Sequence, residues 1–282
     1  MARGIKAVEL NKRDKFVLFL LDKFRVLDTK SISILADFTS ESYCSTRLQK
    51  LARYGYINRE KLVNTLPLVH WLTQKGNDEI NDKRTKHKPR LATLEHELII
   101  GHVACFLHLH YGAQPKKIIT DRELRQYERE VNDVRVMEHK GDLLFFDPQS
   151  GSKIVNEIEL TFKGKSRTIQ NIRKNARFSD RQLWFIRKTM RGLENTLISQ
   201  GVSKGQIVYL DTLDLERRLD DCIIDMDIAG YSSRDNIASY FKRADKPLES
   251  RLDKIARERK ESTNKPPQEP KQGAGSFFDR FR

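Results

Sequence analysis

The sequence predicts an α/β protein, α+β overall, with two folded domains and a charged tail. Residues 1–82 hold short amphipathic helices followed by two β-prone runs, and residues 83–92 form a basic linker. Residues 93–241 alternate helical and β-prone segments, which is typical of a mixed sheet covered by helices. Residues 242–282 are charged and rich in proline, which predicts a disordered basic tail.

The composition argues against several classes of protein. The 282 residues are 38% hydrophobic with a mean hydropathy of −0.64, and no apolar run approaches the ~20 residues that cross a bilayer. The N-terminus has no apolar segment of the kind found in signal peptides. The cysteines are far apart and form no CxxC pair, so we expect reduced thiols and no zinc site. These features predict a cytoplasmic bacterial protein without membrane insertion.

Charge is unevenly distributed along the chain. Residues 1–93 carry 19 basic against 10 acidic side chains, residues 94–241 carry 22 of each, and residues 242–282 carry 12 against 7. A basic excess in one domain and a tail indicates a polyanionic partner, most simply nucleic acid. The neutral middle of the chain holds the acidic candidates described below. This layout suits a nuclease in which basic regions bind the nucleic acid and acidic residues form the active site.

The first domain is predicted from apolar residues at helical spacing. Ser40 is a suitable N-cap for a helix that Gly55 ends, and two β-prone runs follow it. Three helices followed by a β-ribbon resemble a winged helix-turn-helix. The expected elements are helices at 11–24, 31–38 and 41–54, a two-stranded wing at 56–59 and 68–72, and a short helix at 73–80.

The helix at 41–54 is the candidate for reading DNA. Cys44, Leu48 and Leu51 recur on its inner side, so its polar residues face outward, where they suit phosphates and base edges. The alternative is a winged-helix module for protein contacts, with a solvated helix face. The basic linker either follows a phosphate backbone or is a plain connector. The predicted DNA contacts are Ser42, Ser45, Thr46, Arg47, Gln49, Lys50 and Arg53 on this helix, and Arg59 on the wing.

The second domain opens with a long apolar helix. Within that helix, His96 and His102 are six residues apart rather than four, so the HExxH pattern of a zinc metalloprotease is excluded. The expected elements are helices at 93–111, 168–178 and 190–200, a helical turn at 121–125, and strands at 117–120, 143–146, 154–162, 182–186 and 206–210.

The central hairpin of this domain carries the candidate active site. Pro148 and Gly151 separate two apolar runs, and strand alternation places Glu157 and Glu159 on one face of the second run. Antiparallel pairing sets Asp142 across from that segment. Three carboxylates on one face need a compensating charge, and a divalent cation bound by oxygen ligands is the natural candidate. The alternative is a solvated strand face without a ligand.

Two further segments indicate partners. The basic turn after the hairpin extends the predicted DNA contacts to Lys165 and Arg167. In the tail, Phe277, Phe278 and Phe281 lie within one helical turn in the motif FFDRF. This spacing favours a peptide that docks in a partner's groove, and the alternative is a tail end that folds back onto the domain.

Asp142 followed by Glu157-Ile-Glu159 on adjacent strands resembles the PD-(D/E)xK nuclease fold. The resemblance implies a restriction-endonuclease-like mixed-sheet domain. The last position is usually lysine, and glutamate also occurs there, although it removes the usual positive charge. On a continued strand Lys163 would lie roughly 13 Å beyond Glu159. It could then reach the site only through a bulge or from the turn, together with Lys165.

A larger set of motifs resembles the replication-relaxation family, which includes the MOBC-type plasmid relaxases. These motifs are His96-Glu97-Leu98, IITDRELR ending at Arg125, GDLLFF starting at Gly141 and NEIELTFK ending at Lys163, and the resemblance covers residues 10–215. It implies a protein that recognises double-stranded plasmid DNA at a transfer or replication origin and nicks one strand, for conjugative mobilisation or replication. A relaxosome or coupling protein could then bind the tail.

The same resemblance assigns the catalytic residues by position. Asp142, Glu157 and Glu159 would hold Mg²⁺ or Mn²⁺, which activates the nucleophile and stabilises the leaving oxygen. Lys163 would assist. HUH-type relaxases attack with a tyrosine and bind metal through a histidine cluster, whereas this chain shows no such histidine motif and no tyrosine that stands out. Attack by water and a covalent intermediate therefore both stay open.

Two other hypotheses fit the sequence. One is a catalytically inactive DNA-binding relaxosome accessory or replication regulator, which needs the winged helix but not the carboxylates. The other is a defence or restriction-type nuclease, with the same chemistry in a different biological setting.

Overall fold

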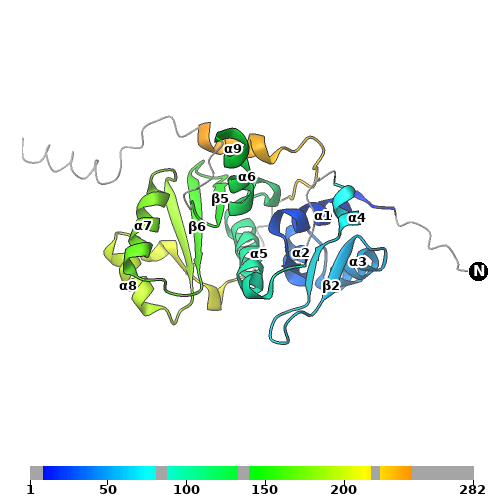
Figure 1. The fold of residues 1–282 in the computed structure, drawn as a ribbon, viewed down its shortest axis with the longest axis horizontal. Helices are drawn as coiled ribbons and strands as arrows, with labels where there is room; N and C mark the ends of the chain where they lie inside the picture. The colour runs from blue at the N-terminus through cyan, green and yellow to red at the C-terminus, as the bar shows by residue number, and fades with distance from the viewer. Residues whose placement is uncertain (1–8, 81–87, 133–139, 217–222, 243–282) are drawn as a thin grey trace, which may run out of the picture. The chain divides into compact units, whose positions relative to one another are not determined.

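The computed structural model describes residues 9–80, 88–132, 140–216 and 223–242, which form a mixed α/β fold (Figure 1). The predicted class is thereby confirmed at the level of helices and sheets. The described residues belong to one compact unit, Met1–Asp245. The predicted tail beyond Lys242, its FFDRF motif and part of the basic linker lie outside them. No helix of the described residues is long and apolar enough to cross a membrane.

The N-terminal part consists of helices and a three-stranded antiparallel sheet with the order β1-β3-β2. The Ser40 side chain caps α3 as predicted, because it accepts a hydrogen bond from the Tyr43 N–H at 3.2 Å. The prediction lacked β1, since a two-residue strand that pairs only with distant β3 leaves no local pattern. The elements are α1 (Lys12–Phe24), β1 (Leu27–Asp28), α2 (Thr29–Leu35), α3 (Glu41–Arg53), β2 (Ile57–Glu60), β3 (Val69–Leu72) and α4 (Gln74–Asp78).

The C-terminal part is built on a five-stranded sheet with the order β4-β5-β6-β7-β8. Strand β5 is antiparallel to both neighbours, whereas β6, β7 and β8 run parallel, so the sheet is mixed as predicted. The elements are α5 (Leu91–Tyr111), β4 (Ile119–Thr120), α6 (Asp121–Asn132), β5 (Leu143–Phe146), β6 (Lys153–Glu159), α7 (Lys165–Ala176), β7 (Arg181–Ile186), α8 (Arg191–Ser199), β8 (Ile207–Tyr209) and α9 (Ser233–Lys242), with 3-10 turns at Pro115–Lys117, Lys204–Gln206 and Leu210–Thr212.

The C-terminal part departs from the prediction at α6, β6 and α9. Helix α6 extends well beyond the predicted turn at 121–125. Strand β6 ends at Glu159, before the end of the predicted strand at 154–162, because the chain bends at Leu160 and turns toward α7. Helix α9 was not predicted. It packs through Ile237 and Tyr240 against α6, β4 and β5, so residues just before the predicted tail belong to the fold.

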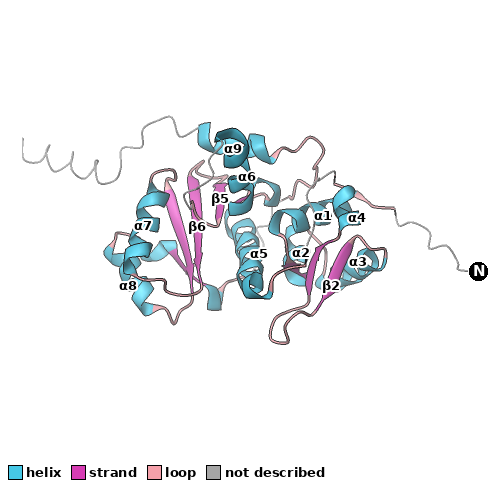
Figure 2. Ribbon diagram, viewed as in Figure 1, coloured by secondary structure: helices cyan, strands magenta, loops and turns pink. Residues whose placement is uncertain are grey.

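Helices cover both faces of the five-stranded sheet (Figure 2). Phe145 and Ile158 face α5 and belong to the main core, whereas Trp184 packs on the opposite face against residues of α7 and α8. Helices α6 and α9 lie on that same opposite face, over β4 and β5. Because side chains alternate along β6, Glu157 and Glu159 point toward the α7 side.

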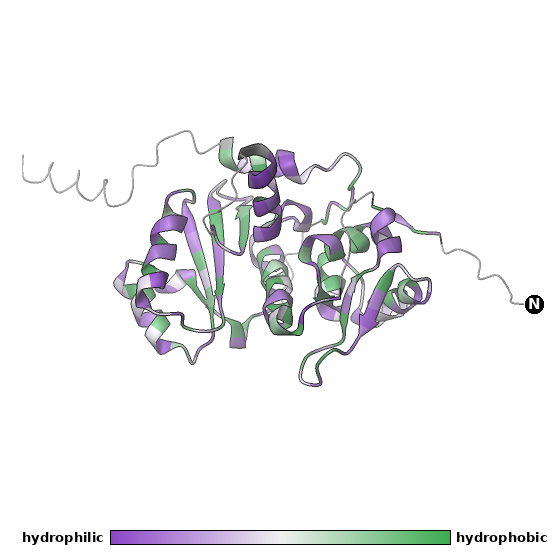
Figure 3. Ribbon diagram, viewed as in Figure 1, coloured by the Kyte–Doolittle hydropathy of each residue, from purple (hydrophilic) through white to green (hydrophobic). Residues whose placement is uncertain are grey.

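The chain before and after the predicted linker shares one hydrophobic core. Phe16 of α1 belongs to the same buried cluster as Val103 and Leu107 of α5. Helix α5 begins inside the predicted linker and is mainly hydrophobic in Figure 3, whereas α6 is mainly hydrophilic there. A buried ion pair also joins α1 to α6, with Lys23 Nζ 2.8 Å from the Glu123 carboxylate. The two predicted domains are therefore packed together through α5.

Candidate functional site

The acidic candidates lie close together because β5 and β6 form the expected hairpin. Leu143 pairs with Asn156 in the ladder, and the Asp142 N–H donates to the Asn156 carbonyl at 2.9 Å. Asp142 thus lies opposite Glu157, in the register that the sequence predicts. Asp142, Glu157 and Glu159 are all found at the end of the hairpin that lies away from its turn.

Glu157 is buried, with 2% of its surface exposed, and its carboxylate has two amide partners from α7. Asn171 Nδ2 donates to one oxygen at 2.9 Å, and Asn175 Nδ2 donates to the other at 3.4 Å. These hydrogen bonds offset the cost of burying the carboxylate. Sequence reasoning missed both asparagines. Their spacing of four residues on the inner side of a helix is the signal that points to them.

Lys163 lies close to Glu159 because β6 ends there and the chain folds back. The Lys163 Nζ is 3.0 Å from Glu159 Oε2. The separation of roughly 13 Å for a continued strand therefore does not apply, and Lys163 arrives from the turn. Burial raises the pKa of Glu159, and the Lys163 ammonium opposes that shift while Glu157 adds to it. The pair places a cation beside the buried carboxylates.

The Asp142 carboxylate is held by a hydrogen bond from the backbone of β6. Its Oδ2 accepts a hydrogen bond from the Ile158 N–H at 2.8 Å, and its Oδ1 lies 3.7 Å from His96 Nε2 at the start of α5. Burial and the nearby Lys163 ammonium lower the pKa of His96, so this imidazole is neutral at pH 7. Sequence reasoning did not place His96 at the site. Its only signal was the family motif that begins with it.

The carboxylates do not form a ready-made metal centre. Among the residues that the structure describes, no group of three or more His, Cys, Asp or Glu side chains is arranged to hold a metal ion. Glu157 is hydrogen-bonded by asparagines and Glu159 is ion-paired. The oxygen donors of Asp142, Glu157 and Glu159 nevertheless match in kind the ligands that Mg²⁺ and Mn²⁺ prefer. A metal would therefore have to replace some of these internal contacts.

A basic pocket adjoins the carboxylates at the start of α7. Its volume is about 540 Å³. Gly164 is the N-cap of α7, at φ 103°, and no side chain caps the helix. This backbone conformation favours glycine, and the first N–H groups of the helix lack a capping acceptor. The polar side chains that line it are Lys163, Lys165, Ser166, Arg167, Gln170, Asn171 and Lys174.

The exposed face of α3 carries five of the ten predicted DNA contacts. Gln49, Lys50 and Arg53 are exposed and make no side-chain hydrogen bond or ion pair within the described part of the chain. Arg59 on β2 donates to the Ser45 hydroxyl at 3.3 Å, so this pair borders the face. The residues that share the face are Ser42, Thr46, Gln49, Lys50 and Arg53.

Arg47 does not belong to that face. Its Nε donates to Asp14 Oδ1 at 2.6 Å, its second guanidinium nitrogen donates to Asp14 Oδ2, and the Asp14 side chain is 1% exposed. Asp14 also forms the capping box of α1 with Asn11. Arg47 therefore fastens α3 to the start of α1, although it was predicted to contact DNA.

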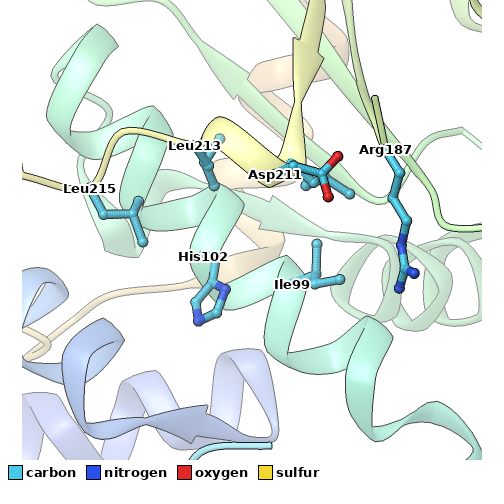
Figure 4. Close-up of a pocket in the computed structure, with 7 residues that line it drawn as sticks. Ile99, His102, Arg187, Asp211, Leu213 and Leu215 are labelled. Atoms are coloured by element: carbon cyan, nitrogen blue, oxygen red, sulfur yellow. The ribbon is translucent and has the colours of Figure 1, made fainter. Parts of the chain in front are cut away.

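A second pocket of about 280 Å³ lies between α5 and the segment after β8 (Figure 4). His102 on its wall contacts Asp28 Oδ2 at 2.7 Å, and Arg187 pairs with Glu95 at 2.5 Å. Asp211 accepts a hydrogen bond from the Lys188 N–H at 2.7 Å. None of the predicted site residues lines this pocket. We therefore do not regard it as part of the candidate active site.

No protein-family model, curated protein sequence or solved structure matches the chain. The candidate site therefore rests on the residues and their geometry.

Proposed function

We propose that the chain is an origin-recognising DNA relaxase or nickase that makes a metal-dependent cut in one strand of plasmid DNA. The observation that carries this proposal is the position of Asp142. Its N–H and its carboxylate both bond to the β6 backbone, which keeps Asp142 beside Glu157 and near Glu159. The basic pocket adjoins these carboxylates, so acidic and phosphate-binding chemistry occur side by side.

The N-terminal part supports recognition of double-stranded DNA. The succession α1-β1-α2-α3-β2-β3, with the sheet order β1-β3-β2, is the one expected of a winged helix-turn-helix. In that fold α3 would enter the major groove, where Gln49, Lys50 and Arg53 have the donor groups to contact base edges and phosphates. These side chains make no hydrogen bond or ion pair with the described residues, which supports such a role.

The C-terminal part supports strand cleavage in the manner of a PD-(D/E)xK nuclease. Asp142, Glu157 and Glu159 would hold Mg²⁺ or Mn²⁺, which supplies an activated water and stabilises the leaving oxygen. Lys163 balances the charge of Glu159, and neutral His96 stands where it can exchange a proton with Asp142 or a bound water. The setting would be the bacterial cytoplasm, with the tail as a contact for a relaxosome or coupling protein.

A specific observation favours a second candidate, a DNA-binding relaxosome accessory or replication regulator that does not cut. Glu157 has both oxygens hydrogen-bonded to Asn171 and Asn175, and Glu159 is paired with Lys163. A carboxylate site that is already satisfied has no need of a metal. This candidate keeps the DNA-binding role of α3 and gives the carboxylates a structural role.

A nicking assay separates the two candidates. Supercoiled plasmid carrying the origin region of the source replicon is incubated with wild type and Glu159→Ala, each with Mn²⁺ and with EDTA, before and after protease treatment. Glu130→Ala, which removes an exposed carboxylate of α6, is the matched control. Open circles that require metal and Glu159 but not Glu130 support the nickase. Protein attached to one DNA end would add a covalent intermediate.

The opposite result is equally clear. Tight binding to the origin region without open circles in any wild-type reaction would overturn the nickase and leave the accessory protein. Nicking that is as fast in Glu159→Ala as in wild type would overturn the assignment of the carboxylates.

A further inference from the structure

We infer that the basic pocket at the start of α7 binds a backbone phosphate of the DNA strand that is cut. This inference rests on the proposed function and adds to it the part of the site that holds the substrate strand. The pocket has a volume of about 540 Å³, within the range of roughly 300–1,000 Å³ typical of ligand sites.

The charge of the pocket selects an anion. Among the residues that the structure describes, four of the lining side chains are basic and none is an aspartate or glutamate. Lysine and arginine are the side chains that most often contact DNA phosphates. The uncapped N–H groups at the start of α7 add partial positive charge on the same side, because Gly164 offers no side-chain oxygen to them.

Two of the basic side chains are not held by short polar contacts within the described part of the chain, although the Arg167 charge acts on the nearby Glu159 carboxylate. Lys165 and Arg167 are exposed and make no hydrogen bond or ion pair with any residue that the structure describes. Several other basic residues of the fold are paired, for example Lys23 with Glu123 and Arg47 with Asp14. Lys165 and Arg167 can therefore meet a phosphate without breaking an existing contact.

The walls of the pocket are shared with the carboxylates. Asn171, which is 8% exposed, lines the pocket and donates to Glu157 at 2.9 Å. Lys163 also lines it and lies 3.0 Å from Glu159. A phosphate in the pocket would thus be separated from each glutamate by one side chain. This adjacency identifies the bound strand as the strand that the carboxylates act on, rather than as DNA held elsewhere on the surface.

The test measures DNA binding by the full chain in EDTA, so that it does not depend on cutting. The double variant K165A/R167A is compared with R173A/R177A, which removes two exposed charges from the C-terminal end and C-cap of α7 without touching the pocket lining. We expect K165A/R167A to weaken binding of an origin duplex about tenfold or more and to lower the salt slope by about 1 to 2. The control should bind as wild type does.

A second arm locates the phosphate. Single backbone phosphates of the duplex are replaced, one at a time, by neutral methylphosphonate. One or two replacements next to the nicked position should weaken binding to wild type but not to K165A/R167A. Inorganic phosphate is titrated in the same assay, and it should compete only weakly, because a DNA strand makes additional contacts.

Three results would overturn the inference. They are equal binding by K165A/R167A and R173A/R177A, methylphosphonate effects that are the same in wild type and K165A/R167A, and full competition by inorganic phosphate at micromolar concentration. Loss of nicking by Glu159→Ala is a separate result. A chain that binds through the pocket but never nicks would support the pocket and overturn only the nickase.

Discussion

The exposed face of α3 and the carboxylate end of β6 differ in whether their polar side chains are paired with other residues of the described chain. On α3, Lys50 and Arg53 point outward and have no hydrogen-bond or ion-pair partner among the described residues. At the end of β6, Glu157 is hydrogen-bonded by two asparagines and Glu159 is ion-paired with Lys163. The first surface can meet a ligand as it stands. At the end of β6, a ligand would have to replace the internal contacts of these glutamates, so ligand binding there should depend on what displaces those contacts.

The largest expected effect tests the second surface. Asp142→Asn should slow metal-dependent nicking at least about a hundredfold, because it removes a charged oxygen donor, whereas binding to the origin duplex should change little. Open-circle formation and fluorescence anisotropy measure the two properties. Asp235→Asn on α9 is the control for a lost surface charge. Undiminished nicking by Asp142→Asn would show that the β6 carboxylates do not act in the reaction.

The next effect concerns a basic residue of α3 that is not on its exposed face. Arg47→Ala leaves the buried Asp14 carboxylate without its guanidinium partner and should lower the free energy of unfolding by about 2 kcal/mol or more. Urea denaturation compares it with Lys50→Ala, which should unfold as wild type does. If Arg47→Ala is fully stable and loses only DNA affinity, then Arg47 belongs with the exposed face after all.

A smaller effect tests the exposed face itself. Lys50→Ala and Arg53→Ala should each weaken binding to the origin duplex about tenfold and reduce the salt slope by about 1, while the metal dependence of nicking stays as in wild type. Lys204→Ala, an exposed basic residue outside both surfaces, is the control. Equal affinities for all three variants would remove α3 from the DNA interface.

The smallest effect is a pH dependence at Glu159. Because burial raises its pKa in the folded chain, protonation of Glu159 favours the folded state. The contribution of Glu159 to stability should therefore rise as pH falls through its folded pKa toward the ordinary value near 4.5, and it should be least favourable at neutral pH. Glu159→Gln removes this dependence. Parallel unfolding profiles for wild type and Glu159→Gln across this acidic range would contradict the shift.

Local sequence patterns were sufficient for much of the fold. The helical spacing around Cys44 and Leu48, the Ser40 cap and the hairpin register at Asp142 all follow from residues close together in the chain, and each agrees with the structure. The mixed sheet follows from the alternation of strands and helices. In these places the relevant contacts lie within a helix or between two neighbouring strands.

The remaining features depend on contacts between distant residues. Asp14 and Arg47 meet because α1 and α3 pack together, and neither local pattern contains the other residue. His96 reaches Asp142 only once α5 has packed against the sheet. The position of Lys163 depends on where β6 stops, and the apolar residues Leu160 and Phe162 suggested a longer strand. The predicted tail, with its FFDRF motif, lies outside the described residues.

Helix α5 lies between the N-terminal helices and the five-stranded sheet and packs against both. Its residues follow the predicted linker in the chain, yet they complete the core of the N-terminal part. Exchange of the N-terminal part for another one by design would therefore have to carry α5 along. A junction placed after Tyr111 would keep Val103 of α5 together with Phe16 of the N-terminal helices. A junction placed in the linker would separate these two residues, and the apolar surface on each side would then have to pack against a different protein segment.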